Sequence, residues 1–510
     1  MANCHVVNAL SKLIFVNTNT PGGSAPPGTG LHAGHVLETP GIYTASGLAN
    51  GMNDLTPMVS RASNGVSGDV RVPGDKSISH RALLIGASAV GETEIAGLLE
   101  AGDIMATAAA LRALGIEIER AGGDAAADPV WRVRGRGVGG LAEPETVLDL
   151  GNSGTGARLL MGLLASHPFA SVLTGDASLR ERPMARVMEP LGRMGAEFTA
   201  RGGGGGRLPV TVHGTDMLRP VTETLAVASA QVKSAILFAA LNTQGRTSVV
   251  EPNPSRDHTE LLLRHFGADV SVRDESGGAR RISVAGYPEL AGAKVTVPGD
   301  FSSAAFPLVA ALLVPGSNLR LRRVGLNPLR SGLLQTLEEM GARIEIHDLR
   351  DQGGETFADL QVEHGPLKGV TVPAGRAPSM IDEYPILGVA AACAAGVTHF
   401  DGIGELRVKE SDRLAAMAQG LEAAGIEVEE GDDSLTIHGA GGAPKGGATI
   451  ASRLDHRIAM SFLVLGAASK APITIDDGAT IATSFPEFID MMNRLGANME
   501  TSMETDGARP

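Results

Sequence analysis

One short pattern recurs six times along the chain and limits its fold more than any other feature of the sequence. In each copy an apolar helix end is followed by glycine, a small or apolar residue and an alternating segment; the glycines are Gly115, Gly195, Gly267, Gly341, Gly425 and Gly496. Glycine is favoured directly after a helix because it can adopt positive φ, and alternation with a period of two is typical of a half-buried strand. One copy would mean little, but six copies 71 to 84 residues apart predict six α/β units of about that length, too long for a solenoid repeat.

A second repeated phrase divides these units into two groups. Val72–Asp75 (VPGD) recurs as Val297–Asp300 (VPGD), and three of the six glycines lie between the two copies. We therefore expect two domains of three units each, with the chain crossing between them near residues 72–76 and 296–300. The predicted limits are 61–75 together with 299–510 for the first domain and 76–298 for the second.

The composition indicates a folded globular protein that does not cross a membrane. Hydrophobic residues make up 43% of the chain and charged residues 20%, and no apolar run reaches the roughly 18 residues that a spanning helix needs. The nearest candidate, Tyr384–Phe400, is rich in Ala and Gly and is predicted to be a buried helix followed by a strand. Residues 1–60 are poor in charge and show no secretory or mitochondrial signal, so we predict a disordered leader there.

The charge balance argues against nucleic acid as a partner. The net charge is −14 and aromatic residues are only 3%, so the chain lacks the basic surface that attracts phosphate backbones and the rings that stack on bases. An anionic ligand would need a local cluster of Arg and Lys. The two cysteines, Cys4 and Cys393, cannot form a disulfide framework or a thiolate metal site, and we expect a cytoplasmic protein.

The densest group of polar residues is Pro73–Arg81, which leads into an apolar helix. Lys76, Ser77 and Arg81 lie on or near its first turn, where free N–H groups and the helix dipole favour anions. An anion cradle is one interpretation of this segment. An ordinary capped helix with solvated charges is the other.

Three further segments also place polar residues at the start of predicted helices. In Gly151–Arg158 a cation comes after several glycines, which favours an oxyanion site, although glycine-rich turns often only cap a helix. Arg182 precedes a proline, and a surface charge cluster is its alternative explanation. Ser229–Gln231 begins another apolar helix, and the segment alone indicates no more for Ser229 than an N-cap.

Three segments nearer the C-terminus carry the candidates for proton transfer. Asp382 lies between apolar runs, where partial desolvation would raise its pKa, and an N-cap acid is the alternative. Arg407–Leu414 carries residues of both charges, and its alternative interpretation is a solvated helix. For Asp455–Arg457 the alternative is a His–Asp pair with a structural role. The motifs of metalloproteases and of serine or cysteine hydrolases do not occur. Anion binding with acid/base catalysis is the chemistry that remains.

In this order, the segments resemble the 5-enolpyruvylshikimate-3-phosphate synthase family over about Val66 to Met499. The motifs that carry the resemblance are Gly74–Arg81, Gly151–Thr155, Arg182–Met184, Ser229–Gln231, Val408–Arg413 and Asp455–Arg457. The resemblance implies a two-domain inside-out α/β barrel with six βαβαββ repeats, three per domain. This fold agrees with the six units counted above.

The resemblance also implies a reaction. The family transfers the enolpyruvyl group of phosphoenolpyruvate to the 5-hydroxyl of shikimate 3-phosphate and releases phosphate, a step of chorismate and aromatic amino acid biosynthesis. It implies no metal and no organic cofactor, and the two substrates are the expected small-molecule partners. We expect a monomer that glyphosate inhibits at the phosphoenolpyruvate site.

The resemblance further implies roles for individual residues. Those expected to hold shikimate 3-phosphate are Lys76, Ser77, Arg81, Ser229, Gln231, Ser255 and Arg256. Those expected to hold phosphoenolpyruvate are Lys76, Gly154, Arg182, Arg413 and Arg457, and Ala230, Lys409 and His456 are also expected at the substrates. Asp382 is expected to accept the 5-hydroxyl proton, and Glu410, with Lys76 and His456 nearby, to protonate the methylene carbon.

The sequence departs from the family pattern at four positions. Ala230 replaces a second Ser, Glu405 replaces an Asn, and Thr483 replaces a Lys that would contact phosphoenolpyruvate. His258 stands where others have Tyr, and Arg256 is the expected substitute ligand. At Gly154, where an Ala side chain would intrude on glyphosate, we expect room for the inhibitor.

Two other functions share part of this pattern. UDP-N-acetylglucosamine enolpyruvyl transferase has the same six-unit fold but usually needs a cysteine on a mobile loop, whereas Cys393 lies in an apolar run and Cys4 in the predicted leader. A non-catalytic anion-binding module would keep the arginines without needing Asp382 or Glu410. Both acids are present, which favours the enzyme.

Overall fold

The computed structural model describes residues 55–122 and 129–502. Asp54–Pro510 form one compact unit, and its architecture is α/β, as predicted. Most of the predicted leader, residues 1–54, lies outside the described residues. The predicted end of the leader at residue 60 is wrong, because Met58–Arg61 already form strand β1 and pair with two other strands.

Six four-stranded sheets share one arrangement. In each sheet the first strand is parallel to the second, while the second and third and the third and fourth are antiparallel. In every sheet a helix precedes the fourth strand. Three units run without interruption in the βαβαββ order, over residues 148–213, 222–285 and 371–440, whereas each of the other three sheets takes one strand from elsewhere in the chain. The predicted six-unit fold is confirmed.

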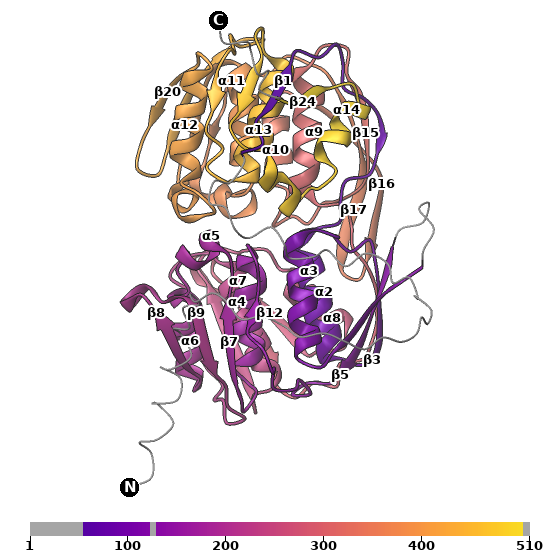
Figure 1. Cartoon of the computed structure of the whole chain (residues 1–510), viewed down its shortest axis with the longest axis vertical. Coiled ribbons are helices and arrows are strands. Elements are labelled where there is room, and N and C mark those ends of the chain that lie inside the picture. Colours follow the sequence, from indigo (N-terminus) through magenta and orange to yellow (C-terminus); the bar gives the residue numbers. More distant parts are fainter. Residues whose placement is uncertain (1–54, 123–128, 503–510) are drawn as a thin grey trace, which may run out of the picture. The chain divides into compact units, whose positions relative to one another are not determined.

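Three sheets lie in the half drawn lower in Figure 1. The first contains β14 (Lys294–Thr296), β3 (Val90–Ala96), β5 (Val130–Arg136) and β4 (Glu117–Ala121), with α2 (Lys76–Ser88) and α3 (Gly102–Ala113). The second contains β6 (Leu148–Asp149), β7 (Ala170–Thr174), β9 (Arg207–His213) and β8 (Glu197–Arg201), with α4 (Gly154–Leu164), α5 (Ala177–Glu181) and α6 (Ala185–Met194). The third contains β10 (Thr222–Thr224), β11 (Arg246–Glu251), β13 (Arg280–Ala285) and β12 (Val270–Asp274), with α7 (Ala230–Leu241) and α8 (His258–His265).

The other three sheets lie in the upper half of the same view. The first contains β2 (Ser67–Val70), β15 (Asn318–Gly325), β17 (Glu355–Glu363) and β16 (Arg343–Gln352), with α9 (Phe301–Leu313) and α10 (Gly332–Glu339). The second contains β18 (Thr371–Val372), β19 (Ala395–Phe400), β21 (Leu435–Ala440) and β20 (Glu427–Glu430), with α11 (Tyr384–Cys393), α12 (Arg413–Ala423) and the 3₁₀ turns η3 (Ala374–Ser379) and η4 (Gly404–Val408). The third contains β22 (Thr449–Ile450), β23 (Ile473–Ile475), β1 and β24 (Asn498–Thr501), with α13 (His456–Ala468), α14 (Phe488–Arg494) and η5 (Ala479–Thr483).

The six repeated glycines take the conformation that the pattern requires. Each follows the helix that precedes the fourth strand of its sheet, and their φ angles lie between 84° and 120°. A residue with a β-carbon is strained at such angles. The predicted helix over the start of Tyr384–Phe400 is also confirmed as buried α11, followed by β19.

Six nearly fully buried helices form the interior, and the sheets lie outside them. In the lower half these helices are α2, α4 and α7, and in the upper half α9, α11 and α13. A helix that is apolar on all sides must be covered on all sides, which explains why the usual order of an α/β barrel is reversed here. Each half has its own hydrophobic core cluster.

The chain crosses between the halves where the repeated phrase predicts. β2 completes an upper sheet before the chain enters α2, and β14 completes a lower sheet before the chain enters α9. The two crossing segments pair with each other: the amide of Asp75 donates to the carbonyl of Pro298 and the amide of Asp300 to that of Pro73, both at 2.8 Å. The long β16–β17 hairpin adds a further contact between the halves (Figure 1), since Gln352 donates to Thr296 at 2.8 Å.

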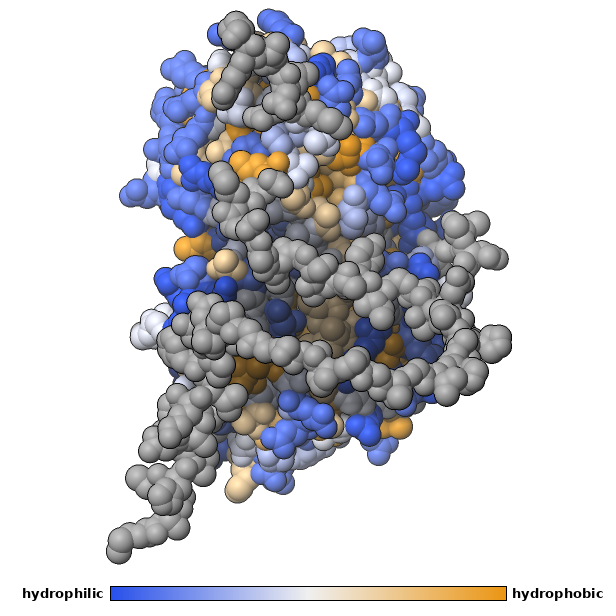
Figure 2. Space-filling model, in the orientation of Figure 1, coloured by the Kyte–Doolittle hydropathy of each residue, from blue (hydrophilic) through white to orange (hydrophobic). Residues whose placement is uncertain are grey.

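Hydrophilic side chains cover most of the described surface on the face shown in Figure 2, with small apolar patches between them. In residues 55–122 and 129–502, no helix combines the length and apolar character needed to span a bilayer.

Candidate active site

The N-termini of the six interior helices converge on one cavity of about 720 Å³. Five of these helices are capped by a side chain that accepts a backbone N–H: Asp75, Ser153, Ser229, Asp300 and Asp455. Because a helix N-terminus carries about half a positive charge, six such ends around one space favour an anionic ligand.

All but one of the predicted site residues line this cavity. Those on its wall are Lys76, Ser77, Arg81, Gly154, Arg182, Ser229, Ala230, Gln231, Ser255, Arg256, Asp382, Lys409, Glu410, His456 and Arg457. Arg413 is the exception, because its side chain is fully buried behind Asp382 and Glu410. The capping and ligand interpretations of Ser229 do not exclude each other, since it caps α7 and also faces the cavity.

The lower wall is organised by hydrogen bonds among its cations and polar side chains. Lys76 forms an ion pair with Asp103. The guanidinium of Arg81 donates to Thr259 at 2.6 Å and Ser234 at 2.8 Å, and burial lowers the pKa of Arg81 to about 10, so it remains charged at neutral pH. These contacts hold the charges of Lys76 and Arg81 at the start of α2.

A buried ion cluster supports the loop that carries Ser255 and Arg256. Lys233 is 1% exposed and contacts Glu251 at 2.9 Å and Glu260 at 2.8 Å. The same ammonium donates to the carbonyl of Ser255 at 3.2 Å, and the Ser255 hydroxyl donates to Glu251. The loop is therefore fixed from below while Arg256 points across the cavity to Asp382.

The upper wall is built around Arg413. Its guanidinium donates to Asp455 at 2.8 Å and to Asp382 at 3.2 Å, and it also pairs with Glu410. Burial raises the pKa of Glu410, but the charges of Arg413 and Arg182 outweigh it and hold that pKa well below its ordinary value. Glu410 is therefore a carboxylate in this state.

The raised pKa expected for Asp382 is wrong. Burial does raise it, but Arg256, Arg457, Lys409 and Arg413 together hold the pKa of Asp382 well below its ordinary value. The apolar residues on either side of Asp382 in the sequence indicate only desolvation, whereas the cations come from other elements. Asp382 is thus ionised and ready to accept a proton.

His456 lies in the same wall as a neutral imidazole. Burial first, and then the charge of Arg457, lower its pKa to about 3. Its Nε2 atom has no hydrogen-bond partner among the described residues. A neutral ring with an unpaired nitrogen at the cavity can bind a polar group of a ligand.

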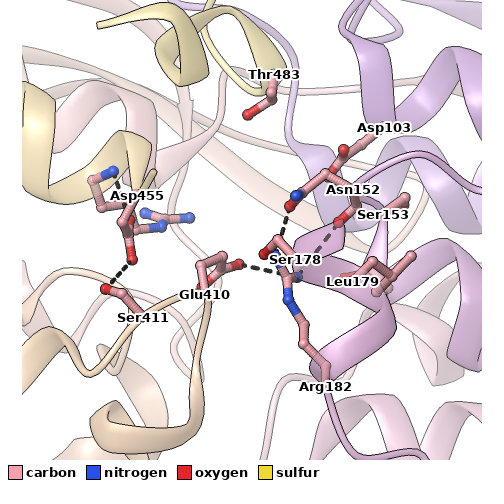
Figure 3. A network of polar contacts seen from close by, with 12 residues as sticks. Asp103, Asn152, Ser153, Ser178, Leu179, Arg182, Glu410, Ser411, Asp455 and Thr483 are labelled. Carbon is pink, nitrogen blue, oxygen red and sulfur yellow. Dashed lines mark hydrogen bonds and ion pairs between the residues drawn. The ribbon is translucent and has the colours of Figure 1, made fainter. Parts of the chain in front are cut away.

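Cations of the lower half face carboxylates of the upper half across the cavity. Arg182 donates to Asn152 at 2.6 Å and Ser178 at 3.2 Å, and its guanidinium lies 3.9 Å from Glu410 (Figure 3). Arg186 in α6 pairs with Glu405 in η4 at 2.8 Å. An anionic ligand in the cavity would therefore compete with Glu410 and Asp382 for the same guanidinium groups.

The four departures from the family pattern have distinct surroundings. Thr483 does not line the cavity and lies apart from the contacts of Arg182 and Glu410 in Figure 3. Its hydroxyl donates to the carbonyl of Thr480 at 2.7 Å. Ala230 and Glu405 line the cavity. His258 is buried away from the cavity wall and pairs with Glu355 at 2.7 Å, whereas Arg256 is on the wall, as expected of the substitute ligand.

Sequence reasoning missed several charged residues of the wall. Asp103, Arg186, Asp300 and Arg330 line the cavity without having been predicted there, and Arg158 was noted only as a cation in its motif. A signal existed for Asp300, since it is the equivalent of Asp75 in the repeated VPGD phrase. No motif marks Arg330 or Arg186. Among the described residues, no group of three or more His, Cys, Asp or Glu is arranged to hold a metal ion.

Comparisons with known proteins identify the family of the chain. The family model described as EPSP synthase (3-phosphoshikimate 1-carboxyvinyltransferase) matches residues 60–492. The chain is 61% identical over 443 residues to the 3-phosphoshikimate 1-carboxyvinyltransferase of Paramagnetospirillum magneticum, covering 87% of this chain and 98% of that one. It is 58% identical to the enzyme of that name from Rhodospirillum rubrum, covering 86% and 97%.

Solved structures give the same result. The EPSP synthase of Acinetobacter baumannii superposes with a TM-score of 0.77 at 43% identity, covering 88% of this chain and all of that one. The enolpyruvyl transferase NikO of Streptomyces tendae, at 20% identity and a TM-score of 0.68, shares the fold. On its repeats, its cavity and these matches, the chain belongs to the EPSP synthase (3-phosphoshikimate 1-carboxyvinyltransferase) family.

Proposed function

We propose that this chain transfers the enolpyruvyl group of phosphoenolpyruvate to the 5-hydroxyl of shikimate 3-phosphate and releases phosphate. The observation that carries the proposal is the composition of the cavity wall: arginines and lysines at converging helix N-termini, with two ionised carboxylates, Asp382 and Glu410, among them. The cations suit two highly anionic substrates, and the carboxylates suit the proton transfers between them.

Shikimate 3-phosphate is assigned to the lower wall. Its phosphate and hydroxyls have suitable partners in the residues that line this side: Lys76, Ser77, Arg81, Ser229, Gln231, Ser255 and Arg256. The support is geometric, because Gln231 is held by Thr155 and Arg158 at 2.9 Å each and the loop of Ser255 and Arg256 rests on buried Lys233.

Phosphoenolpyruvate is assigned to the space between the halves. Lys76, Arg182, Lys409 and Arg457 surround this space, and Arg413 supports it from behind. Arg182 and Arg457 come from opposite halves, so this substrate would draw the halves together and exclude water.

In the proposed chemistry, Asp382 accepts the proton of the attacking 5-hydroxyl. Its carboxylate is held by Arg256 and Arg413. When the substrate phosphate takes Arg256, the carboxylate loses one counter-charge and becomes more basic. Glu410 lies on the same wall as Lys76 and His456. Because it is ionised, its carboxylate first takes a proton from the Lys76 ammonium and then delivers that proton to the methylene carbon. When phosphate leaves, the Glu410 carboxylate removes a proton from the same carbon.

The alternative acceptor, a UDP-sugar, is not favoured. The matched relatives carry the 3-phosphoshikimate name, and Cys393 is unsuited to the reactive cysteine of the rival enzyme, because burial raises the pKa of its thiol to about 12.

An acceptor test checks the proposed reaction. Purified protein is expected to release phosphate from phosphoenolpyruvate when shikimate 3-phosphate is added and not when UDP-N-acetylglucosamine is added. Phosphate release is followed with a coupled optical assay. Release with the UDP-sugar alone would assign the chain to the rival reaction, and release with neither would contradict the proposal.

Gly154→Ala is expected to weaken inhibition by glyphosate, which we propose binds in the phosphoenolpyruvate space. A β-carbon at Gly154 would lie 3.1 Å from guanidinium nitrogens of both Arg158 and Arg182. Displacing such groups costs about 1–3 kcal/mol, which corresponds to an inhibition constant about 5- to 150-fold higher. The control is Gly192→Ala on α6, where an added β-carbon meets no atom within 4 Å. An inhibition constant equal to that of the control would refute the idea.

We further propose that the enzyme acts as a cytoplasmic monomer with the two predicted domains. One chain supplies the whole cavity wall, and the low cysteine content suits a reducing compartment. Separate core clusters on either side of the crossing segments support the domain limits given above.

A further inference from the structure

A buried arginine lies where the two crossing segments meet. Arg330 precedes α10, and its side chain is 4% exposed. Its guanidinium donates to Asp300 at 3.0 Å and to Ser302 at 2.6 Å, at the start of α9. Its Nε lies 3.9 Å from Asp75, the N-cap of α2. Arg330 therefore contacts the aspartate that ends each crossing.

The other edge of the same guanidinium reaches the proposed base. Arg330 donates to Glu383 at 3.0 Å and lies 4.0 Å from Asp382. The hydroxyl of Ser302 also donates to Glu383, which closes a ring of contacts between α9 and the start of α11. One side chain thus links the base in the upper half to the crossing into the lower half.

Carboxylates surround the guanidinium of Arg330. Four carboxylates lie within 4 Å of it: Asp75, Asp300, Asp382 and Glu383. Two further groups lie near the cluster: Arg457 acts on Asp300, and His258 acts on Asp75. Neither of these two forms an ion pair with Asp300 or Glu383 in the described residues. Removing Arg330 therefore leaves that pair of carboxylates without a contact cation.

We propose that Arg330 is a positioning residue that fixes Asp382 relative to the N-terminus of α2. The inference rests on the proposed function, in which Lys76 and Ser77, directly after Asp75, hold shikimate 3-phosphate while Asp382 takes its proton. Substrate and base are carried by different halves, and a path of contacts runs from Asp75 through Arg330 to Glu383 and Asp382. Loss of Arg330 misplaces the base without removing a substrate ligand.

The test separates catalysis from binding. For Arg330→Gln we expect kcat to fall about 100-fold, the size of effect that a displacement near 1 Å produces, while the dissociation constant of shikimate 3-phosphate measured by calorimetry stays close to that of the wild type. Arg330→Lys should recover part of kcat, because an ammonium can still contact Glu383 or Asp300. The control Arg320→Gln loses carboxylate contacts of the same half, to Asp359 and Asp348, and should keep kcat.

A second variant separates positioning from loss of charge balance. Arg330→Gln combined with Asp300→Asn removes one of the stranded carboxylates and should recover melting temperature but not kcat. Recovery of both would show that Arg330 only balances charge and would overturn the proposal, as would a normal kcat in Arg330→Gln. Asp382→Ala and the wild type are measured alongside. Wild-type phosphate release that does not depend on shikimate 3-phosphate would refute the proposed function, and full activity of Asp382→Ala would refute the role of Asp382 as the base. If Asp382→Ala is inactive and Arg330→Gln is normal, only the role of Arg330 fails.

Discussion

Asp382→Asn is expected to lower kcat for phosphate release by about 10²- to 10⁴-fold, the usual contribution of a general base. The amide keeps the shape of the carboxylate and can still accept a hydrogen bond from Arg256 or Arg413, so substrate binding should change far less than kcat. What the amide cannot do is take the 5-hydroxyl proton. Initial rates at saturating substrates, with the melting temperature of each variant, measure the effect.

The pH profile gives a second readout of the same residue. The pKa of Asp382 lies well below its ordinary value because four cations outweigh the effect of burial. The carboxylate is therefore ionised down to low pH, and kcat/KM of the wild type should show no acid limb from Asp382 above about pH 5. Asp359→Asn, which alters a carboxylate that pairs with Arg320 in the same half, serves as the control and should keep kcat. Full activity of Asp382→Asn would remove Asp382 from the mechanism.

Arg413→Met is expected to destabilise the protein by about 3–5 kcal/mol, the cost of breaking a buried ion pair from one side. The side chain is fully buried and pairs with Asp455, Asp382 and Glu410. Methionine fills part of the space but leaves these carboxylates without their shared counter-charge. Activity should fall as well, because Asp382 and Glu410 lose the group that orients both.

The loss of stability should depend on pH with a definite sign. In the wild type Arg413 lowers the pKa of Asp455 and Glu410, so the stability they contribute is present above their unfolded pKa values and is lost as pH falls. Without Arg413, burial dominates and raises both pKa values, so these acids favour folding only when protonated. The difference in free energy of unfolding between Arg413→Met and the wild type should therefore be larger at pH 8 than at pH 5.

Guanidinium chloride titrations at both pH values measure this difference. Arg320→Met is the control, because Arg320 is 39% exposed and an exposed pair is worth about 1 kcal/mol or less. A variant Arg413→Met as stable as this control at pH 8 would contradict the role given to Arg413.

The fold could be predicted from sequence because its decisive signals are local. A glycine after a helix, followed by a strand in which apolar and polar residues alternate, can be recognised within ten residues. Copies of that pattern define the units without any knowledge of their packing. The VPGD phrase marks both crossings for the same reason. Each crossing ends in an aspartate that caps the next helix, and such a cap is also a local signal.

The parts of the site that could not be predicted depend on distant neighbours. The pKa of Asp382 is set by Arg256, Lys409, Arg413 and Arg457, which lie on other elements. Arg330 has no motif, because its partners Asp75 and Glu383 are brought to it only by the crossings and by α11. The order of charged residues along the chain does not indicate which of them lie close together in the fold.

The exchange of strands at the crossings also has a consequence for biosynthesis. Strand β1 lies near the start of the described residues, yet Arg61 pairs with Glu500, which is added 439 residues later. At about 5–20 residues per second the delay is about 20 to 90 s. Residues 76–297 meanwhile acquire every strand of their three sheets, so this half can complete itself during translation. Strand β2 stays unpaired only until β15 is made, whereas β1 waits for β23 and β24 near the end of the chain. An unpaired strand is a hazard for aggregation.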